Sequence, residues 1–176
     1  NTQDVSNRLR GKPGTTIEIV VERDSQLITK EVTRRDIHLP AVGYATVLQD
    51  SIAYIFFNEF TTNSAQEFLM ALDSMVQNHG INRLIMDLRG NGGGLIDEAI
   101  QIVSYFVPKD TEVVATKGKI ERTNRSYKTS TSPIFPDMPL VVLVNGQSAS
   151  ASEIVAGSLQ DLKRATIVGE RTFGKG

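Results

Sequence analysis

The first forty residues carry a different hydrophobic pattern from the rest of the chain. A short helix is predicted from Asp4 to Arg10, because the helix breakers Gly11-Lys12-Pro13-Gly14 follow it. Apolar and polar residues then alternate over two stretches, Thr15 to Arg23 and Leu27 to Thr33, which predicts an antiparallel hairpin. One helix and one hairpin cannot make a core alone.

A second pattern, in which strands and helices alternate, begins near His38, where we place a domain boundary. The predicted strands are Ser51 to Phe57, Leu84 to Leu88 and Leu140 to Val144, with a further candidate at Glu112 to Thr116. Three helices, each with one apolar face, are predicted along with these strands. The apolar positions are Phe68, Leu69, Leu72, Met75 and Val76 in the first helix, Leu95, Ile96, Ala99, Ile100 and Val103 in the second, and Ile154, Val155, Leu159 and Leu162 in the third. The polar stretch Lys117 to Met138 is expected to be a long exposed excursion. The predicted organisation is a small unit, residues 1–37, followed by an α/β domain, residues 38–176.

The composition narrows the classes of function. With 40% hydrophobic and 22% charged residues, the chain is an ordinary globular protein. Its 19 basic and 20 acidic residues leave a formal net charge of -1, so the balance favours neither a nucleic-acid partner nor an anionic membrane surface. Cysteine is absent from the sequence, which excludes disulfides, thiolate metal sites and cysteine nucleophiles. No apolar run approaches the length of a membrane span.

A serine-rich turn connects the buried strand Leu140 to Val144 with the helix that follows it. The turn contains Ser148, Ser150 and Ser152. A nucleophile at such a turn would be held rigidly at the carboxyl end of the strand, close to the amides of the helix. The same residue type is also a favoured helix N-cap, so the spacing alone leaves both interpretations open.

A glycine-rich loop, Gly90 to Gly94, follows the strand Leu84 to Leu88. Glycines allow backbone N–H groups to converge at a helix N-terminus, where they stabilise an oxyanion or a bound anion. The other interpretation is a tight turn without a ligand. The loop lacks the ending of a phosphate-binding P-loop and the spacing of a dinucleotide site, so it predicts no nucleotide.

The sequence offers few general bases that could activate a serine. Its two histidines are His38, interpreted as a linker residue, and His79, interpreted as a cation at a helix C-terminus. They are separated in sequence and have no acidic ligands at metal-site spacing, so no metal site is predicted. A lysine can replace histidine as the base when a poorly solvated site keeps it neutral. Lys175, between Gly174 and Gly176, is the candidate, although Gly-Lys-Gly is common in loops.

Three blocks of the sequence together resemble the C-terminal processing peptidases, a family of serine peptidases. The blocks are Asp87-Leu88-Arg89-Gly90-Asn91-Gly92-Gly93-Gly94, Asn145-Gly146-Gln147-Ser148-Ala149-Ser150-Ala151-Ser152-Glu153-Ile154 and Gly169-Glu170-Arg171-Thr172-Phe173-Gly174-Lys175-Gly176. The resemblance implies that Ser150 is the nucleophile and Lys175 its general base. It also implies that the amides of Gly93, preferred over Gly92, and Ala151 form the oxyanion hole. Neither a cofactor nor a metal is implied.

The same resemblance implies a crotonase- and Clp-type β-α superhelical fold for residues 38–176. Residues 1–37 are similar to the last helix and final strands of a PDZ domain, in which Val5 and Leu9 would line the peptide-binding groove. The first part of that domain, and a glutamine that the family places four residues after its lysine, are not in this sequence. We therefore expect the parent protein to be active and this fragment by itself to be inactive.

The function implied by the resemblance is an endopeptidase that cleaves flexible polypeptides near a nonpolar C-terminus after PDZ-assisted capture. Its partners would be polypeptides with a free C-terminus and no nucleic acid, a homo-oligomer is left open, and the implied location is the periplasm or cell envelope. One alternative is a non-catalytic peptide- or ligand-binding module on the same fold, against which the presence of both Ser150 and Lys175 argues. Another is a crotonase-like acyl-CoA enzyme, in which neither Ser150 followed by Gly-Lys-Gly nor a PDZ remnant is expected.

Overall fold

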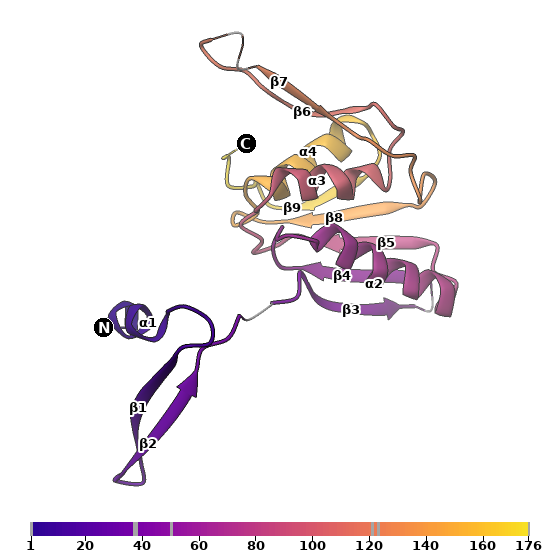
Figure 1. The fold of residues 1–176 in the computed structure, drawn as a ribbon. Coiled ribbons are helices and arrows are strands. Elements are labelled where there is room, and N and C mark those ends of the chain that lie inside the picture. The colour runs from indigo at the N-terminus through magenta and orange to yellow at the C-terminus, as the bar shows by residue number, and fades with distance from the viewer. Residues whose placement is uncertain (1, 37–38, 50, 121, 123, 176) are drawn as a thin grey trace. The chain divides into compact units, whose positions relative to one another are not determined.

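The computed structural model (Figure 1) describes residues 2–36, 39–49, 51–120, 122 and 124–175. The chain forms two compact units, Asn1–Leu39 and Pro40–Gly176, each defined by the contacts among its own residues. His38, near which the sequence places the boundary, lies outside the described residues. Across the described part of the chain, no helix combines the length and the apolar character that a bilayer span requires.

The first unit consists of one helix and one β-hairpin. Helix α1 spans Thr2–Leu9, and strands β1, Thr16–Arg23, and β2, Gln26–Thr33, pair antiparallel. The two residues of the turn, Asp24 and Ser25, both have positive φ, 50° and 62°, as a type I′ turn requires. The predicted helix and hairpin are thus found, with ends shifted by one or two residues. None of the described residues of this unit is buried, so the helix and hairpin form no core of their own.

A five-stranded mixed sheet forms the centre of the second unit, in the order β3-β4-β5-β8-β9 (Figure 1). The strands are β3 Val42–Leu48, β4 Ile52–Phe57, β5 Arg83–Asp87, β8 Leu140–Val144 and β9 Thr166–Gly169. Strand β3 is antiparallel to β4, and the other neighbours are parallel. The helices are α2 Ser64–His79, α3 Ile96–Ser104 and α4 Ala151–Asp161, and α3 contacts both α2 and α4, so the three form one layer. This arrangement confirms the predicted α/β class.

The core lies between the sheet and the helical layer. Strands β4 and β8 alternate buried and half-buried residues, as expected when helices cover one face of a sheet. Phe57 of β4 is fully buried, and its ring packs edge to face on Phe60 and Phe68 at centroid distances of 4.9 and 5.8 Å. Phe68 in turn packs on Phe106 at 6.4 Å. These contacts join β4, α2 and the segment after α3 into one cluster.

The excursion that starts at Lys117 is more structured than expected. Strand β7, Arg125–Lys128, pairs antiparallel with β6, Glu112–Thr116, in a two-stranded ribbon. Further along, the guanidinium of Arg164 donates a hydrogen bond to the carbonyl oxygen of Met138 at 2.7 Å, and Met138 is buried. The expectation that the whole stretch is exposed is therefore wrong, because hydrogen bonds to its backbone hold a largely polar segment against the domain.

Candidate active site

Ser150 lies at the turn between β8 and α4. It is the N-cap of α4, and its backbone has φ 55° and ψ -115°. Non-glycine residues rarely adopt positive φ, and holding one there costs about 1–3 kcal/mol, a strain that tends to occur at functional turns. The capping interpretation also applies, because Ser150 and Glu153 form a capping box in which the Glu153 carboxylate accepts the N–H of Ser150 at 2.9 Å.

The other two serines of this turn make structural contacts. Ser148 and Ser152 are both completely buried. The hydroxyl of Ser148 donates to the carbonyl oxygen of Leu88 at 2.7 Å, and that of Ser152 donates to the carbonyl oxygen of Asn91 at 3.0 Å. They bind the turn to the end of β5 and to the glycine-rich loop. Among the three serines, Ser150 alone is half-exposed.

The glycine-rich loop packs against the Ser150 turn at Gly93, which has φ 100°. A Cβ atom at this position would lie 2.5 Å from the carbonyl oxygen of Ala149, 2.8 Å from Cβ of Ser150 and 2.9 Å from the nitrogen of Ala151. Only glycine allows so close an approach. The structure therefore brings the two predicted oxyanion residues, Gly93 and Ala151, together beside Ser150.

Asn91 holds this loop in place from inside the protein. It is 1% exposed, and its Nδ2 donates to the carbonyl oxygen of Phe57 at 2.8 Å. Its Oδ1 accepts the N–H of Gly93 at 2.8 Å, and its own carbonyl oxygen accepts the N–H of Ala149 at 3.1 Å. The amide of Gly93 thus already has an acceptor. The amide of Ala151 has none among the residues that the structure describes.

Lys175 lies in the segment after β9, and Glu153 ties its backbone to the Ser150 turn. The carboxylate of Glu153 accepts the N–H groups of Gly174 and Lys175 at 2.7 and 2.9 Å and the hydroxyl of Thr172 at 2.9 Å. Lys175 is exposed, in contrast to the poorly solvated position expected from the sequence. Within the described part of the chain, no hydrogen bond joins its amine to the hydroxyl of Ser150.

The four hydrogen bonds received by Glu153 favour its ionised form. Burial acts in the opposite direction, because desolvation raises the pKa of a carboxyl group. The donors from Ser150, Gly174, Lys175 and Thr172 outweigh it and lower the pKa of Glu153 to about 2. Sequence reasoning assigned Glu153 no role, although an acidic residue three positions after a serine N-cap is the signal of a capping box.

A second charged cluster lies where β5 leads into the glycine-rich loop. Asp87, 1% exposed, accepts hydrogen bonds from the hydroxyl of Tyr54 at 2.5 Å and from Nε and Nη2 of Arg89 at 2.9 and 2.6 Å. Burial would raise the pKa of Asp87, but the bonds from Arg89 and Tyr54 outweigh it and lower that pKa. The bond to Asp87 raises the pKa of Arg89. Sequence reasoning also gave this cluster no role. Its signal in the sequence is an aspartate at the end of a buried strand, because a charge buried there needs a partner.

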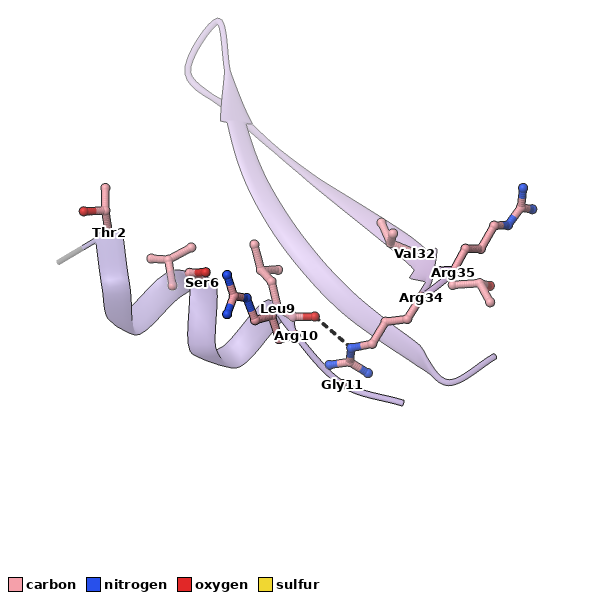
Figure 2. Close-up of a pocket in the computed structure, with 10 residues that line it drawn as sticks. Thr2, Ser6, Leu9, Arg10, Gly11, Val32, Arg34 and Arg35 are labelled. Carbon is pink, nitrogen blue, oxygen red and sulfur yellow. Dashed lines mark hydrogen bonds between the residues drawn. The ribbon is translucent and has the colours of Figure 1, made fainter. Parts of the chain in front are cut away.

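Val5 and Leu9, predicted to line a peptide groove, lie on α1 with 55% and 44% of their surfaces exposed. They line a groove between α1 and the end of β2, to which Val32 contributes (Figure 2). Nε of Arg34 donates to the carbonyl oxygen of Leu9 at 2.8 Å, and this cation caps the C-terminus of α1. The first unit therefore has a partly apolar groove with arginines at one end.

Comparison with known proteins points to one family. Residues 51–176 match the model of peptidase family S41. The chain is 39% identical to a carboxyl-terminal-processing protease of Picosynechococcus sp., over 99% of this chain and 42% of that protein. It is 38% identical to a probable CtpA-like serine protease of Staphylococcus haemolyticus, over 96% of this chain and 33% of that protein. The chain thus spans well under half the length of these relatives.

Solved structures agree with the sequence relatives. The photosystem II D1 C-terminal processing protease is similar over 99% of this chain and 48% of that one, with a TM-score of 0.68 and 31% identity. A putative S41 protease from Bacteroides fragilis shares the fold, with a TM-score of 0.64 at 18% identity. The family match extends over more than half of the chain and includes the Ser150 turn, the glycine-rich loop and the Lys175 segment. The chain belongs to peptidase family S41.

Proposed function

We propose that the full-length protein is a serine endopeptidase in which Ser150 is the nucleophile and Lys175 the general base. The observation that carries this proposal is the convergence of three separate segments on one turn. Ser150 is held in a strained conformation, Gly93 packs against it, and the backbone of Lys175 is bound to the same turn through a carboxylate. Nucleophile, amide donors and base are the parts that acyl transfer requires.

In the first half of the reaction, the neutral amine of Lys175 accepts the hydroxyl proton of Ser150 while the oxygen attacks the carbonyl carbon of the scissile bond. The C–N bond then breaks, the ammonium of Lys175 returns the proton to the leaving amine, and the acyl group remains on Ser150 as an ester. In the second half, water deprotonated by Lys175 hydrolyses the ester. Because Lys175 is exposed in this structure, a substrate lying over the turn has to exclude water from it.

The oxyanion of the tetrahedral intermediate would be bound by the amides of Gly93 and Ala151. The amide of Ala151 is at the first position of α4, where the helix dipole favours negative charge. The amide of Gly93 would exchange the Oδ1 of Asn91 for the oxyanion, which is the stronger acceptor because it is charged. One such donor contributes about 100- to 1,000-fold to kcat in other peptidases.

The proposed substrates are flexible polypeptides captured by a nonpolar C-terminus. Two relatives are named for C-terminal processing. The exposed apolar side chains of Val5 and Leu9 in the groove of the first unit are suited to an apolar C-terminal side chain, if residues 1–37 form part of a PDZ domain. A location in the periplasm or cell envelope is proposed along with this substrate class, since the family implies it.

The test uses the full-length protein and its Ser150→Ala and Lys175→Ala variants with a loosely folded polypeptide that ends in an apolar residue. Fragments are followed by mass spectrometry, and the same polypeptide with an amidated C-terminus tests whether the free carboxylate is needed. We expect cleavage by the unaltered protein alone, with slower cleavage of the amidated substrate. Full activity in either variant would overturn the Ser150–Lys175 dyad. Tight binding of the polypeptide without cleavage by any form would support the binding-module alternative instead.

A further inference from the structure

One carboxylate links the Ser150 turn with the Lys175 segment. Oε2 of Glu153 accepts the N–H of Ser150 and the N–H of Lys175, each at 2.9 Å. The two amide nitrogens therefore lie within about 6 Å of each other, twice the length of a hydrogen bond. Oε1 accepts the hydroxyl of Thr172 at 2.9 Å and the N–H of Gly174 at 2.7 Å.

A helix cap alone does not explain this arrangement. The capping box of α4 needs, from the Glu153 side chain, only the bond to the N–H of Ser150. The other three donors belong to Thr172, Gly174 and Lys175, which lie 19 to 22 positions further along the chain. These residues form neither helix nor strand, so the carboxylate supplies order that secondary structure does not.

We propose that Glu153 is a positioning residue that sets the distance and alignment between Ser150 and Lys175. This inference rests on the proposed function, because it assumes that Lys175 deprotonates Ser150. A lysine side chain is long and flexible, so a fixed backbone restricts where its amine can lie. A general base must be within hydrogen-bond reach of the proton that it accepts. Displacing the backbone of Lys175 therefore slows acylation and leaves substrate affinity nearly unchanged.

Glu153→Gln is the informative substitution because it keeps the size of the side chain and changes its hydrogen-bonding. If the amide nitrogen replaces Oε2, its NH2 group faces the N–H groups of Ser150 and Lys175. All of these groups are donors, so neither N–H has an acceptor there. If it replaces Oε1, it faces the N–H of Gly174 in the same way. Either orientation breaks at least one bond to the Lys175 segment. The matched control is Glu170→Gln, which removes one exposed negative charge from the same segment.

The experiment measures kcat and KM for the full-length protein, both glutamine variants, Lys175→Ala, and the double variant Glu153→Gln/Lys175→Ala. For Glu153→Gln we expect kcat to fall about 100-fold, as for a misplacement of about 1 Å, with KM within about threefold of the unaltered value. Glu170→Gln should match the unaltered protein. In the Lys175→Ala background, Glu153→Gln should cause little further loss, because residues that act as one unit fail together.

The outcomes separate this inference from the proposed function. If Ser150→Ala abolishes cleavage and Lys175→Ala leaves only a small residual kcat, but Glu153→Gln retains normal kcat, the positioning role is wrong and the dyad stands. If the losses of Glu153→Gln and Lys175→Ala multiply, Glu153 does not act through Lys175, which also overturns the inference. If Glu153→Gln does not fold, Thr172→Val replaces it, since that change removes only one donor. It should lower kcat about fivefold, and a loss of the same size in the Lys175→Ala background would overturn the inference.

Discussion

Gly93→Ala is the substitution that tests most directly how the glycine-rich loop meets the Ser150 turn. The new methyl group would overlap the carbonyl oxygen of Ala149 at 2.5 Å, Cβ of Ser150 at 2.8 Å and the nitrogen of Ala151 at 2.9 Å. Two of these three atoms belong to the backbone, which cannot move aside as a flexible side chain can. The loop and the turn would have to separate, and the proposed oxyanion donors and nucleophile would separate with them.

The cost can be worked out from two parts. An L-residue in the left-handed region costs about 1–2 kcal/mol, and Gly93 has φ 100°. Forcing an extra methyl group into a packed site costs about 1–3 kcal/mol more. Together they predict a loss of about 2–5 kcal/mol in the free energy of unfolding, a large part of the 5–15 kcal/mol that is typical of a folded domain.

The assay is denaturant unfolding of the full-length protein, with Gly92→Ala as the matched control one residue away. A Cβ atom at Gly92 has no neighbour within 4 Å, and its φ is outside the left-handed region, so its free energy of unfolding should change by less than about 1 kcal/mol. We also expect Gly93→Ala to lose most of its peptidase activity and Gly92→Ala to keep it. Equal stability of the two variants would refute the close packing of Gly93 on the Ser150 turn.

Three further predictions concern stability. In the folded state the pKa of Glu153 is lowered to about 2 and the pKa of Asp87 is also lowered. Both ionised carboxylates therefore stabilise the protein above their ordinary pKa of about 4, and this stabilisation is lost as pH falls towards the folded pKa values. When unfolding is measured from pH 7 to pH 3, the difference in free energy of unfolding between the unaltered protein and Asp87→Asn should shrink. Arg164→Met should lose about 2–4 kcal/mol in urea unfolding, because three carbonyl oxygens lose their donor. Gly169→Ala should lower hydrogen-exchange protection in β9, since its Cβ would lie 2.0 Å from the carbonyl oxygen of Val144.

Much of the local structure could be predicted from the sequence. The apolar run Leu140 to Val144 is β8, and the spacing of Phe68, Leu72 and Met75 matches the buried face of α2. Strand β3 was not predicted, because it lies at the edge of the sheet with every residue half-buried or exposed, which leaves a weak pattern. The pairing of β7 with β6 was missed because a polar ribbon has little apolar alternation.

The sequence by itself determined the helices, the strands with a clear apolar pattern and the residue types of the candidate site, because all of these depend on short-range spacing along the chain. The tertiary structure decided how the site is assembled. It places Gly93 against Ser150 and hydrogen-bonds the amide of Gly93 to Asn91. It also leaves Lys175 exposed and links its backbone to that of Ser150 through the carboxylate of Glu153. Apart from the bond between Gly93 and Asn91, these contacts join residues tens of positions apart. Local periodicity carries no information about which distant groups come to lie within one hydrogen-bond length.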